Sequence, residues 1–247
     1  MMNDLVSIII ATYNSKATIY KALESVYEQS YQEWECIVVD GCSKDNTLKI
    51  VSAFKKKDDR FRYISEPDKG VFDALNKGIM LSKGEWIYVL GSDDRLYPDA
   101  LENAMNIKEE DSVVLYGDAV ADFGGGVIRP IRTKPVSFMK YNMITSHQAM
   151  LVRKSEMNKF GNFDLQFKLC ADFDFFQKIY LAGAKFQYLK CPIAYYGMEG
   201  LSNGFSFKND WDKYKVCKKN KSNACPLFFF ILDETKWILS KIRNRFL

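Results

Sequence analysis

Five apolar segments alternate with amphipathic segments along the first 116 residues, and this alternation restricts the fold more than any other feature. The apolar segments are residues 5–11, 35–39, 62–65, 85–90 and 113–116. The first of them is a continuous apolar run rich in isoleucine, which is typical of a strand buried on both faces. Strands that alternate with helices favour a parallel sheet with right-handed crossovers. The predicted fold class is therefore α/β, with helices flanking a mainly parallel sheet.

Helices are predicted between these strands. Ser15 is the expected N-cap of a helix in which apolar side chains recur at helical spacing from Ile19 to Tyr27. A second helix is expected over residues 46–54. A third covers Val71–Leu81 and is closed by the Ser-Lys-Gly of residues 82–84, and Pro98 opens a fourth.

The pattern changes after residue 116. Three glycines at 124–126 lie between short extended segments and predict a hairpin turn, and later segments predict a strand at 148–152, a helix at 171–182 and extended runs at 186–189 and 193–196. The sequence contains no linker rich in Pro, Gly or Ser and no internal repeat. We therefore expect one domain over residues 1–205, followed by a basic, amphipathic helical tail over residues 206–247.

Several classes of protein are disfavoured by composition. The longest apolar run is residues 227–232, whereas a membrane-spanning helix needs about 20 such residues. Residues 1–11 have no basic region or cleavage site of a signal peptide and are expected to be a strand. Six cysteines without a CxxC pair, and a single histidine, argue against a zinc cage and for reduced thiols in the cytoplasm.

Polar and acidic residues follow four successive predicted strands. These segments are Thr12-Tyr13-Asn14, residues 40–45, residues 66–70 and Gly91-Ser92-Asp93-Asp94. Ligands of open parallel sheets bind beyond the carboxyl ends of the strands, near a switch in strand order. Aspartate is common in solvated turns, but four such strand ends in a row favour a binding site. Clustered aspartates repel one another unless a cation lies among them, and Asp93-Asp94 is the best candidate for an Mg²⁺ site.

Some nucleotide enzymes and hydrolases are disfavoured because their motifs are absent. No GxGxxG follows the first strand, and neither a GxxxxGK[ST] loop nor a GxSxG elbow occurs. These absences argue against dinucleotide oxidoreductases, P-loop NTPases and α/β-hydrolases.

Residues 6–14, Val38-Val39-Asp40-Gly41 and Gly91-Ser92-Asp93-Asp94 together resemble the inverting family 2 glycosyltransferases with a GT-A fold. Residues 66–78 are similar to the branch that builds bacterial O-antigen and capsular polysaccharides, and residues 147–149 and 171–174 fit that branch. The resemblance covers about residues 5–200. It implies a Rossmann-like GT-A sheet and a metal-dependent hexosyl- or glycosyltransferase that uses a nucleotide-diphosphate sugar, expected to be a UDP-sugar.

The resemblance also implies roles for individual residues, carried over by position. Nucleotide-sugar contacts are expected from Thr12, Tyr13, Asp40, Asp68 and Asp93, with Thr12, Tyr13 and Asp40 at the base and ribose. Asp94 would bind Mg²⁺ or Mn²⁺ that bridges the two phosphates. Asp172 is the expected catalytic base, at the start of a helix whose dipole keeps a carboxylate ionised, and Asp174 is the alternative.

Three positions depart from the family pattern. Gly41 stands where a second aspartate is common, and Leu75 precedes Asn76 where arginine is common, so that Lys69 or Lys77 would have to supply a cation. The acidic pair is Asp93-Asp94 without the full Asp-x-Asp pattern.

His147, the only histidine, is either a buried imidazole that a backbone carbonyl satisfies or a contact to the diphosphate or acceptor. Lys69 is a second candidate for that contact.

The tail carries the net positive charge. Residues 208–247 hold ten basic and four acidic residues, whereas residues 1–207 hold 25 basic and 27 acidic ones. Between residues 228 and 246 an apolar helical face opposes Lys236, Lys241, Arg243 and Arg245. Such a helix suits an anionic membrane surface. Packing on its own domain, or on a second copy in a homodimer, stays open.

The predicted function is the transfer of a sugar from a nucleotide donor to a lipid-linked glycan at the cytoplasmic face of a bacterial membrane. A sugar nucleotidyltransferase is the alternative enzyme, but it needs a glycine-rich loop with arginine after the first strand, where this chain has Thr12-Tyr13-Asn14. A catalytically silent nucleotide-sugar or membrane-binding module is a third interpretation, which Asp40, Asp94 and Asp172 disfavour. Nucleic acid is not an expected partner, because the body is acidic and no reading motif occurs.

Overall fold

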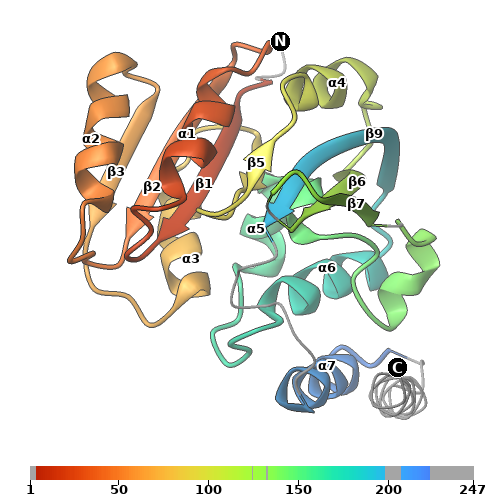
Figure 1. Cartoon of the computed structure of the whole chain (residues 1–247). Helices are drawn as coiled ribbons and strands as arrows, with labels where there is room; N and C mark the ends of the chain where they lie inside the picture. The colour runs from red at the N-terminus through yellow and green to blue at the C-terminus, as the bar shows by residue number, and fades with distance from the viewer. Residues whose placement is uncertain (1–3, 124, 132, 198–206, 223–247) are drawn as a thin grey trace, which may run out of the picture.

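The isoleucines of the first strand alternate between two hydrophobic cores. Ile8 and Ile10 are buried in one core and Ile9 in the other, as the period of two along a strand requires. The computed structural model describes residues 4–123, 125–131, 133–197 and 207–222. In this part of the chain, strands join in one sheet with helices on both faces (Figure 1).

The strand order is β3-β2-β1-β4-β8-β6-β9-β5, with β7 paired to β6. The strands are β1 (Val6–Thr12), β2 (Trp34–Asp40), β3 (Phe61–Ser65), β4 (Trp86–Val89), β5 (Arg95–Leu96), β6 (Val114–Asp122), β7 (Ile128–Ile131), β8 (Met150–Arg153) and β9 (Phe186–Gly197). Strands β1–β4, β6 and β9 run in one direction, and β5, β7 and β8 run in the other. The predicted mainly parallel α/β sheet is confirmed.

The helices form a layer on each face of the sheet. They are α1 (Ile19–Tyr27), α2 (Thr47–Lys57), α3 (Val71–Leu81), α4 (Ala100–Ile107), α5 (Lys154–Phe160), α6 (Ala171–Leu181) and α7 (Phe207–Lys219), with 3₁₀ turns η1 (Val136–Lys140) and η2 (His147–Ala149). Helices α1, α2 and α4 bury apolar side chains in one core. Helices α3, α5, α6 and α7 contribute to the core of the other face.

The predicted hairpin is confirmed at the described residues, because β6 and β7 are antiparallel and the Phe123 N–H donates to the Val127 carbonyl, 2.9 Å away. Gly125 and Gly126 have positive φ angles, which glycine adopts without strain. The two predicted runs at 186–189 and 193–196 are one strand, β9, with an irregularity where Lys190 has a φ of 55°.

Two local predictions were wrong. Ser15 does not cap α1: the helix begins at Ile19, and the Ser15 hydroxyl lies 3.0 Å from the Ser92 hydroxyl, a long-range contact that local pattern cannot reveal. Gln148 is in a 3₁₀ turn, so that β8 begins two residues later than expected. The short strand β5 and the helix α5 were not predicted.

Helix α7 packs on α6, below it in Figure 1. Val216 and Cys217 are buried in the same core as the aromatic residues of α6. The predicted boundary at 205/206 and the predicted amphipathic face at 228–246 lie outside the described residues. Within those residues, no helix is both long enough and apolar enough to cross a membrane. The five described cysteines are free thiols.

Candidate functional site

The strand order reverses between β1 and β4, because the chain builds β1, β2 and β3 outward and then returns to place β4 on the other side of β1. Such a reversal opens a crevice at the carboxyl ends of the strands. The loops after β1 and β2 are joined there, since the Asn14 N–H donates to Ser43 Oγ and the Lys44 N–H donates to Asn14 Oδ1, both over 2.8 Å. The Ser15–Ser92 contact joins the loops after β1 and β4.

Asp40, the last residue of β2, is fully buried. Its Oδ2 accepts hydrogen bonds from the Ser43 N–H over 2.9 Å and the Ser65 hydroxyl over 2.7 Å, and its Oδ1 accepts one from the Ser43 hydroxyl. Asp40 therefore joins the loop after β2 to the carboxyl end of β3. Its expected contact with a nucleotide stays a prediction.

Gly41 leaves space that the Asp68 carboxylate occupies. A Cβ on residue 41 would lie 2.5 Å from Asp68 Oδ2 and 3.5 Å from Tyr13 Cδ2. Position 41, where a second aspartate is common, is thus a glycine that leaves room for the Asp68 carboxylate from the loop after β3. Tyr13 beside it is 60% exposed. The structure brings Tyr13, Gly41 and Asp68 together as one surface.

Thr12, at the end of β1, carries an unsatisfied group. Its Oγ1 is buried and has no hydrogen-bond partner among the residues that the structure describes. A buried hydroxyl without a partner is costly in a protein, so each such atom calls for an explanation. A polar ligand group at the carboxyl end of β1 would supply the missing partner.

Asp94 is only 1% exposed, and burial raises its pKa to about 7, with the charge of Asp93 adding to the rise. Three donors oppose this shift: the Gly197 N–H on Oδ1 over 2.8 Å, the Gly91 N–H on Oδ2 over 3.2 Å, and the Gln148 side chain. The carboxylate is thus held at the carboxyl end of β4 by the loop after β4, the end of β9 and the turn η2.

The donor set around Asp94 fits only part of a cation shell. Among the described residues no group of three or more His, Cys, Asp and Glu side chains could hold a metal ion. Asp93 and Asp94 are close enough to repel each other, and a cation would relieve that repulsion. Mg²⁺ commonly takes one or two carboxylates together with phosphate and water. Two carboxylates could thus hold a cation only together with a bound diphosphate, and this role of Asp93 and Asp94 stays a prediction.

His147 and Asp172 lie side by side. His147 Nδ1 is 3.7 Å from Asp172 Oδ2, and the imidazole packs edge-on against Phe163 and Phe176. Burial lowers the pKa of His147 below 6.5, while the charge of Asp172 opposes the shift. Asp172 is in the first turn of α6, with 19% of its side chain exposed, and its Oδ1 accepts the Phe173 N–H over 2.8 Å.

Asp174, the alternative base, is engaged elsewhere. It is 1% exposed, and its carboxylate accepts hydrogen bonds from the Lys219 ammonium over 3.0 and 2.9 Å and from the Asn220 amide over 3.2 Å. An acceptor hydroxyl could not approach a carboxylate buried in this way. Of the two aspartates, Asp172 is the more exposed, and its role as the proton acceptor stays a prediction.

The two candidate lysines differ in their surroundings. The Lys77 ammonium lies 2.8 Å from Glu66 Oε1 and donates to the Pro67 carbonyl over 2.7 Å, so this side chain holds the loop before α3. Lys69 is exposed, and its backbone N–H, not its ammonium group, donates to Asp73 Oδ2 over 2.9 Å. Lys69 is therefore the more accessible of the two cations, and its role stays a prediction.

The turn η2 links the two groups of predicted residues. His147 contacts Asp172, and its neighbour Gln148 donates to Asp94 and accepts the Tyr88 hydroxyl at its carbonyl over 2.6 Å. Ser43, Ser65 and Gln148 were missed as site residues. Ser43 and Gln148 lie inside the motifs quoted above, but only their partners reveal what they do.

Comparisons with known proteins give matches over most of this chain. The sequence model described as Glycosyl transferase family 2 matches residues 7–181. A PGL/p-HBAD biosynthesis glycosyltransferase of Mycobacterium tuberculosis is 30% identical over 214 residues, which is 82% of this chain and 81% of the relative. The putative teichuronic acid biosynthesis glycosyltransferase TuaG of Bacillus subtilis is 36% identical over 109 residues, 44% of this chain and 43% of TuaG.

Solved structures share the fold. TarS of S. aureus in complex with UDP has a TM-score of 0.71 and 22% identity, over 91% of this chain and 67% of that one. The mannosyltransferase PcManGT of Pyrobaculum calidifontis, in complex with GDP-Man and Mn²⁺, has a TM-score of 0.63 and 15% identity, over 98% of this chain and 82% of that one. These similarities support the expected GT-A architecture.

Proposed function

This chain belongs to glycosyl transferase family 2, and we propose that it moves a sugar from a nucleotide-diphosphate donor to a glycan acceptor with inversion at the anomeric carbon. The main support for this proposal is found at the turn η2. There, His147 contacts Asp172 and the Gln148 side chain donates a hydrogen bond to Asp94. A proton acceptor and a carboxylate suited to a diphosphate-bound cation are thereby held by one short segment.

Asp172 is proposed as the general base. The acceptor oxygen attacks the anomeric carbon from the face opposite the diphosphate, a carbon–oxygen bond forms, and the bond to the phosphate oxygen breaks. The proton of the acceptor hydroxyl passes to the Asp172 carboxylate, and the nucleoside diphosphate leaves. Partial exposure leaves Asp172 accessible to an acceptor.

The donor is proposed to lie over the loops after β1, β2 and β3. The Thr12 hydroxyl without a partner, the exposed Tyr13 ring and the Asp68 carboxylate offer a hydrogen-bonding group, an aromatic face and an acceptor for base and ribose. A UDP-sugar is the proposed donor, because TarS, which has the same fold, is known in complexes with UDP and UDP-GlcNAc. Asp93 and Asp94 would hold Mg²⁺ or Mn²⁺ together with the diphosphate. The metal ion would neutralise the negative charge that develops on the leaving nucleoside diphosphate.

The acceptor is proposed to be a lipid-linked glycan of a surface polysaccharide, used at the inner face of the cell membrane. Relatives named for PGL/p-HBAD and teichuronic acid biosynthesis support a cell-envelope glycan. Of the described tail lysines, Lys213 and Lys215 pair with aspartates of α7 itself, and Lys219 pairs with α6. Support for the membrane therefore rests on the basic, apolar sequence beyond residue 222.

Calorimetric titration of the full chain with UDP, GDP and dTDP, each with and without Mn²⁺, tests the donor site. We expect metal-dependent binding of UDP, which Asp94→Asn abolishes and the surface variant Asp59→Asn leaves unchanged. Binding of none of the nucleotides would overturn the donor site. A second assay adds UDP-sugars to the chain in the presence of membranes that carry lipid-linked glycans. If the chain binds UDP but releases none from any UDP-sugar, a catalytically silent binding module would be favoured instead.

A further inference from the structure

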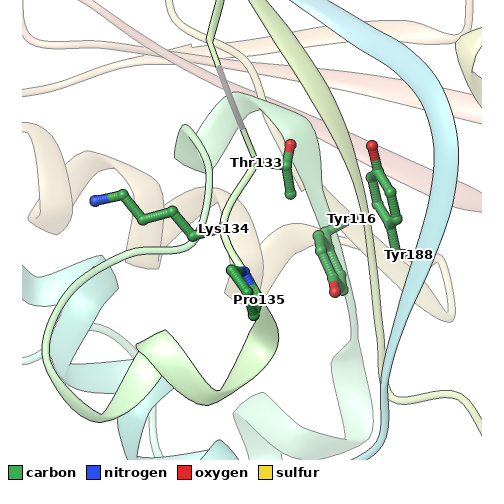
Figure 2. Close-up of a pocket in the computed structure, with 5 residues that line it drawn as sticks. All are labelled: Tyr116, Thr133, Lys134, Pro135 and Tyr188. Atoms are coloured by element: carbon green, nitrogen blue, oxygen red, sulfur yellow. The ribbon is translucent and has the colours of Figure 1, made fainter.

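A cavity of about 540 Å³ opens beside β6 and β9, and no predicted nucleotide-binding residue lines it. Its walls are Tyr116 of β6, Tyr188 of β9 and the segment Thr133-Lys134-Pro135 that precedes η1. Figure 2 shows the two tyrosine rings next to each other, Pro135 on the facing loop, and the Lys134 side chain directed away from the rings. The volume is within the range of small-molecule sites.

The two tyrosines form a cross-strand pair. Tyr116 and Tyr188 are register partners, and their ring centroids are 5.3 Å apart at 25° between the planes. Beyond this pair the register shifts, because one residue of β6, Gly117, faces three of β9. A Cβ on Gly117 would lie 2.4 Å from the Cys191 carbonyl oxygen, so that only glycine permits this close approach of the strands. Such irregularities often lie next to functional sites.

The polar rim of the cavity is ordered by Asp118. Its Oδ1 accepts hydrogen bonds from the Tyr188 hydroxyl over 2.7 Å and from the Thr133 hydroxyl over 2.6 Å. Tyr188 remains 37% exposed although its hydroxyl is held in this way. The aromatic wall is therefore fixed in orientation before any ligand arrives, which lowers the entropy cost of binding.

The chemistry of these walls suits a sugar ring. A pyranose presents a face of C–H groups that packs on an aromatic ring, and its hydroxyls both donate and accept hydrogen bonds. Tyr116, Tyr188 and Pro135 supply the apolar faces, while Thr133 and the Asp118 carboxylate supply polar groups at their edge. An anionic ligand is disfavoured, since the Lys134 ammonium lies 4.0 Å over the Phe138 ring and points away from the tyrosines.

The Gly117 carbonyl connects the cavity to the segment that leads into the candidate catalytic site. The Gly117 carbonyl accepts the Thr133 hydroxyl over 3.4 Å and the Thr145 hydroxyl over 3.2 Å. Thr145 is two residues before His147, which contacts Asp172. We propose that the cavity is a second saccharide site that holds a sugar unit of the acceptor other than the unit that reacts. Its assignment to the acceptor rests on the proposed function, whereas saccharide binding itself does not.

Saturation-transfer NMR on the full chain tests the site with free saccharides as probes. Glucose, galactose, mannose, rhamnose, N-acetylglucosamine and N-acetylgalactosamine would be presented singly without nucleotide, with saturation of the aromatic protons. We expect transfer to the ring C–H protons of at least one sugar, and an affinity about fivefold to tenfold lower in Tyr188→Ala. Tyr188→Phe, which keeps the ring, should retain most of the affinity. Tyr63→Ala is the matched control, since Tyr63 on β3 is equally exposed.

Three outcomes would overturn the saccharide site: no transfer to any of the six sugars, transfer that Tyr188→Ala leaves unchanged, or transfer that Tyr63→Ala reduces equally. A further outcome would also overturn the saccharide site. If saturation transfer disappears at protein concentrations where the chain dimerises, the cavity would belong to the interface with a second copy. UDP titration of the same variants separates this result from the donor site. Tyr188→Ala should bind UDP like the unmodified chain, and failure of UDP to bind either protein would count against the proposed function alone.

Discussion

The Lys219 ammonium lies 2.9 Å from Asp174 Oδ2 and thereby fastens α7 to the first turn of α6. The same ammonium donates to Asp164 Oδ2 over 2.8 Å. Burial would lower the pKa of Lys219, but its bonds to Asp164 and Asp174 outweigh that effect and raise it. Asp172 is two residues before Asp174 in the same turn, so this ion pair supports the helix end on which the proposed base is placed.

Replacement of Lys219 by methionine should therefore destabilise the protein. Within the described part of the chain, the change leaves the buried Asp174 carboxylate with Asn220 as its one side-chain partner, and breaking a buried pair costs about 3–5 kcal/mol. Because the Lys219 side chain is 37% exposed, we expect a smaller loss of about 2 kcal/mol in the free energy of unfolding, measured by urea denaturation.

The neighbouring Lys218 provides the control for this prediction. It is exposed on α7, and Lys218→Met should change the free energy of unfolding by less than about 0.5 kcal/mol. Asp174→Asn should restore part of the stability lost in Lys219→Met, since it removes the uncompensated charge. Equal losses in Lys218→Met and Lys219→Met would show that the ion pair contributes nothing.

Asp172→Asn should lower kcat by about 10²- to 10⁴-fold, the range expected when a general base is removed. The asparagine is close in shape to aspartate, so UDP affinity and melting temperature should stay near their original values. Steady-state release of UDP from the UDP-sugar measures kcat, and titration measures affinity. A variant that keeps its kcat but binds UDP poorly would move Asp172 from the acceptor side to the donor side.

His147 predicts a dependence of stability on pH. Its pKa in the folded state is lowered by burial, so the unfolded chain binds a proton more readily. The groups that face it are the Asp172 carboxylate and the rings of Phe163 and Phe176. As pH falls through about 6.5, the unfolded state takes up the proton first and the stability contributed by His147 is lost.

Urea denaturation of the unmodified chain and of His147→Gln, at pH 7.5 and pH 5, measures this contribution. The difference in unfolding free energy should shift in favour of the variant at the lower pH, because only the unfolded chain takes up the proton readily. Carboxylates elsewhere titrate equally in both proteins and cancel in the difference. A shift of opposite sign would mean that Asp172 holds His147 charged in the folded state.

Gly41→Ala should weaken UDP binding about tenfold, which corresponds to about 1.4 kcal/mol. The new methyl group would lie 2.5 Å from Asp68 Oδ2 and displace that carboxylate from its place beside Tyr13. Melting temperature should change little, because the displaced group is the end of a flexible side chain. In an Asp68→Ala variant, Gly41→Ala should cause no further loss of UDP affinity. If the loss there is as large as in the unmodified chain, displacement of Asp68 is not its cause.

Local patterns in the sequence were sufficient for most of the elements. The helix Val71–Leu81 was predicted to the residue, because its apolar spacing and the Ser-Lys-Gly that follows are local signals. The collection of acidic loops at one sheet edge was also predictable, since parallel strands bring their carboxyl ends together. Ser15 shows where this reasoning stops: its contact is Ser92, 77 residues away, and local capping preference could not reveal it.

The residue types at the ends of β1 to β4 follow directly from the amino-acid sequence, since the apolar runs, the acidic loops and the motif order are all visible in it. The contacts that those residues make depend on how distant segments pack. Insertion of the antiparallel strand β8 beside β4 brings Gln148 to Asp94 and His147 to Asp172, and the docking of α7 buries Asp174 against Lys219. The sequence favours Asp172 as the base and leaves Asp174 as the alternative, but it does not show what surrounds either carboxylate. In the fold, burial and a bound ammonium occupy the Asp174 carboxylate, while the Asp172 side chain stays 19% exposed.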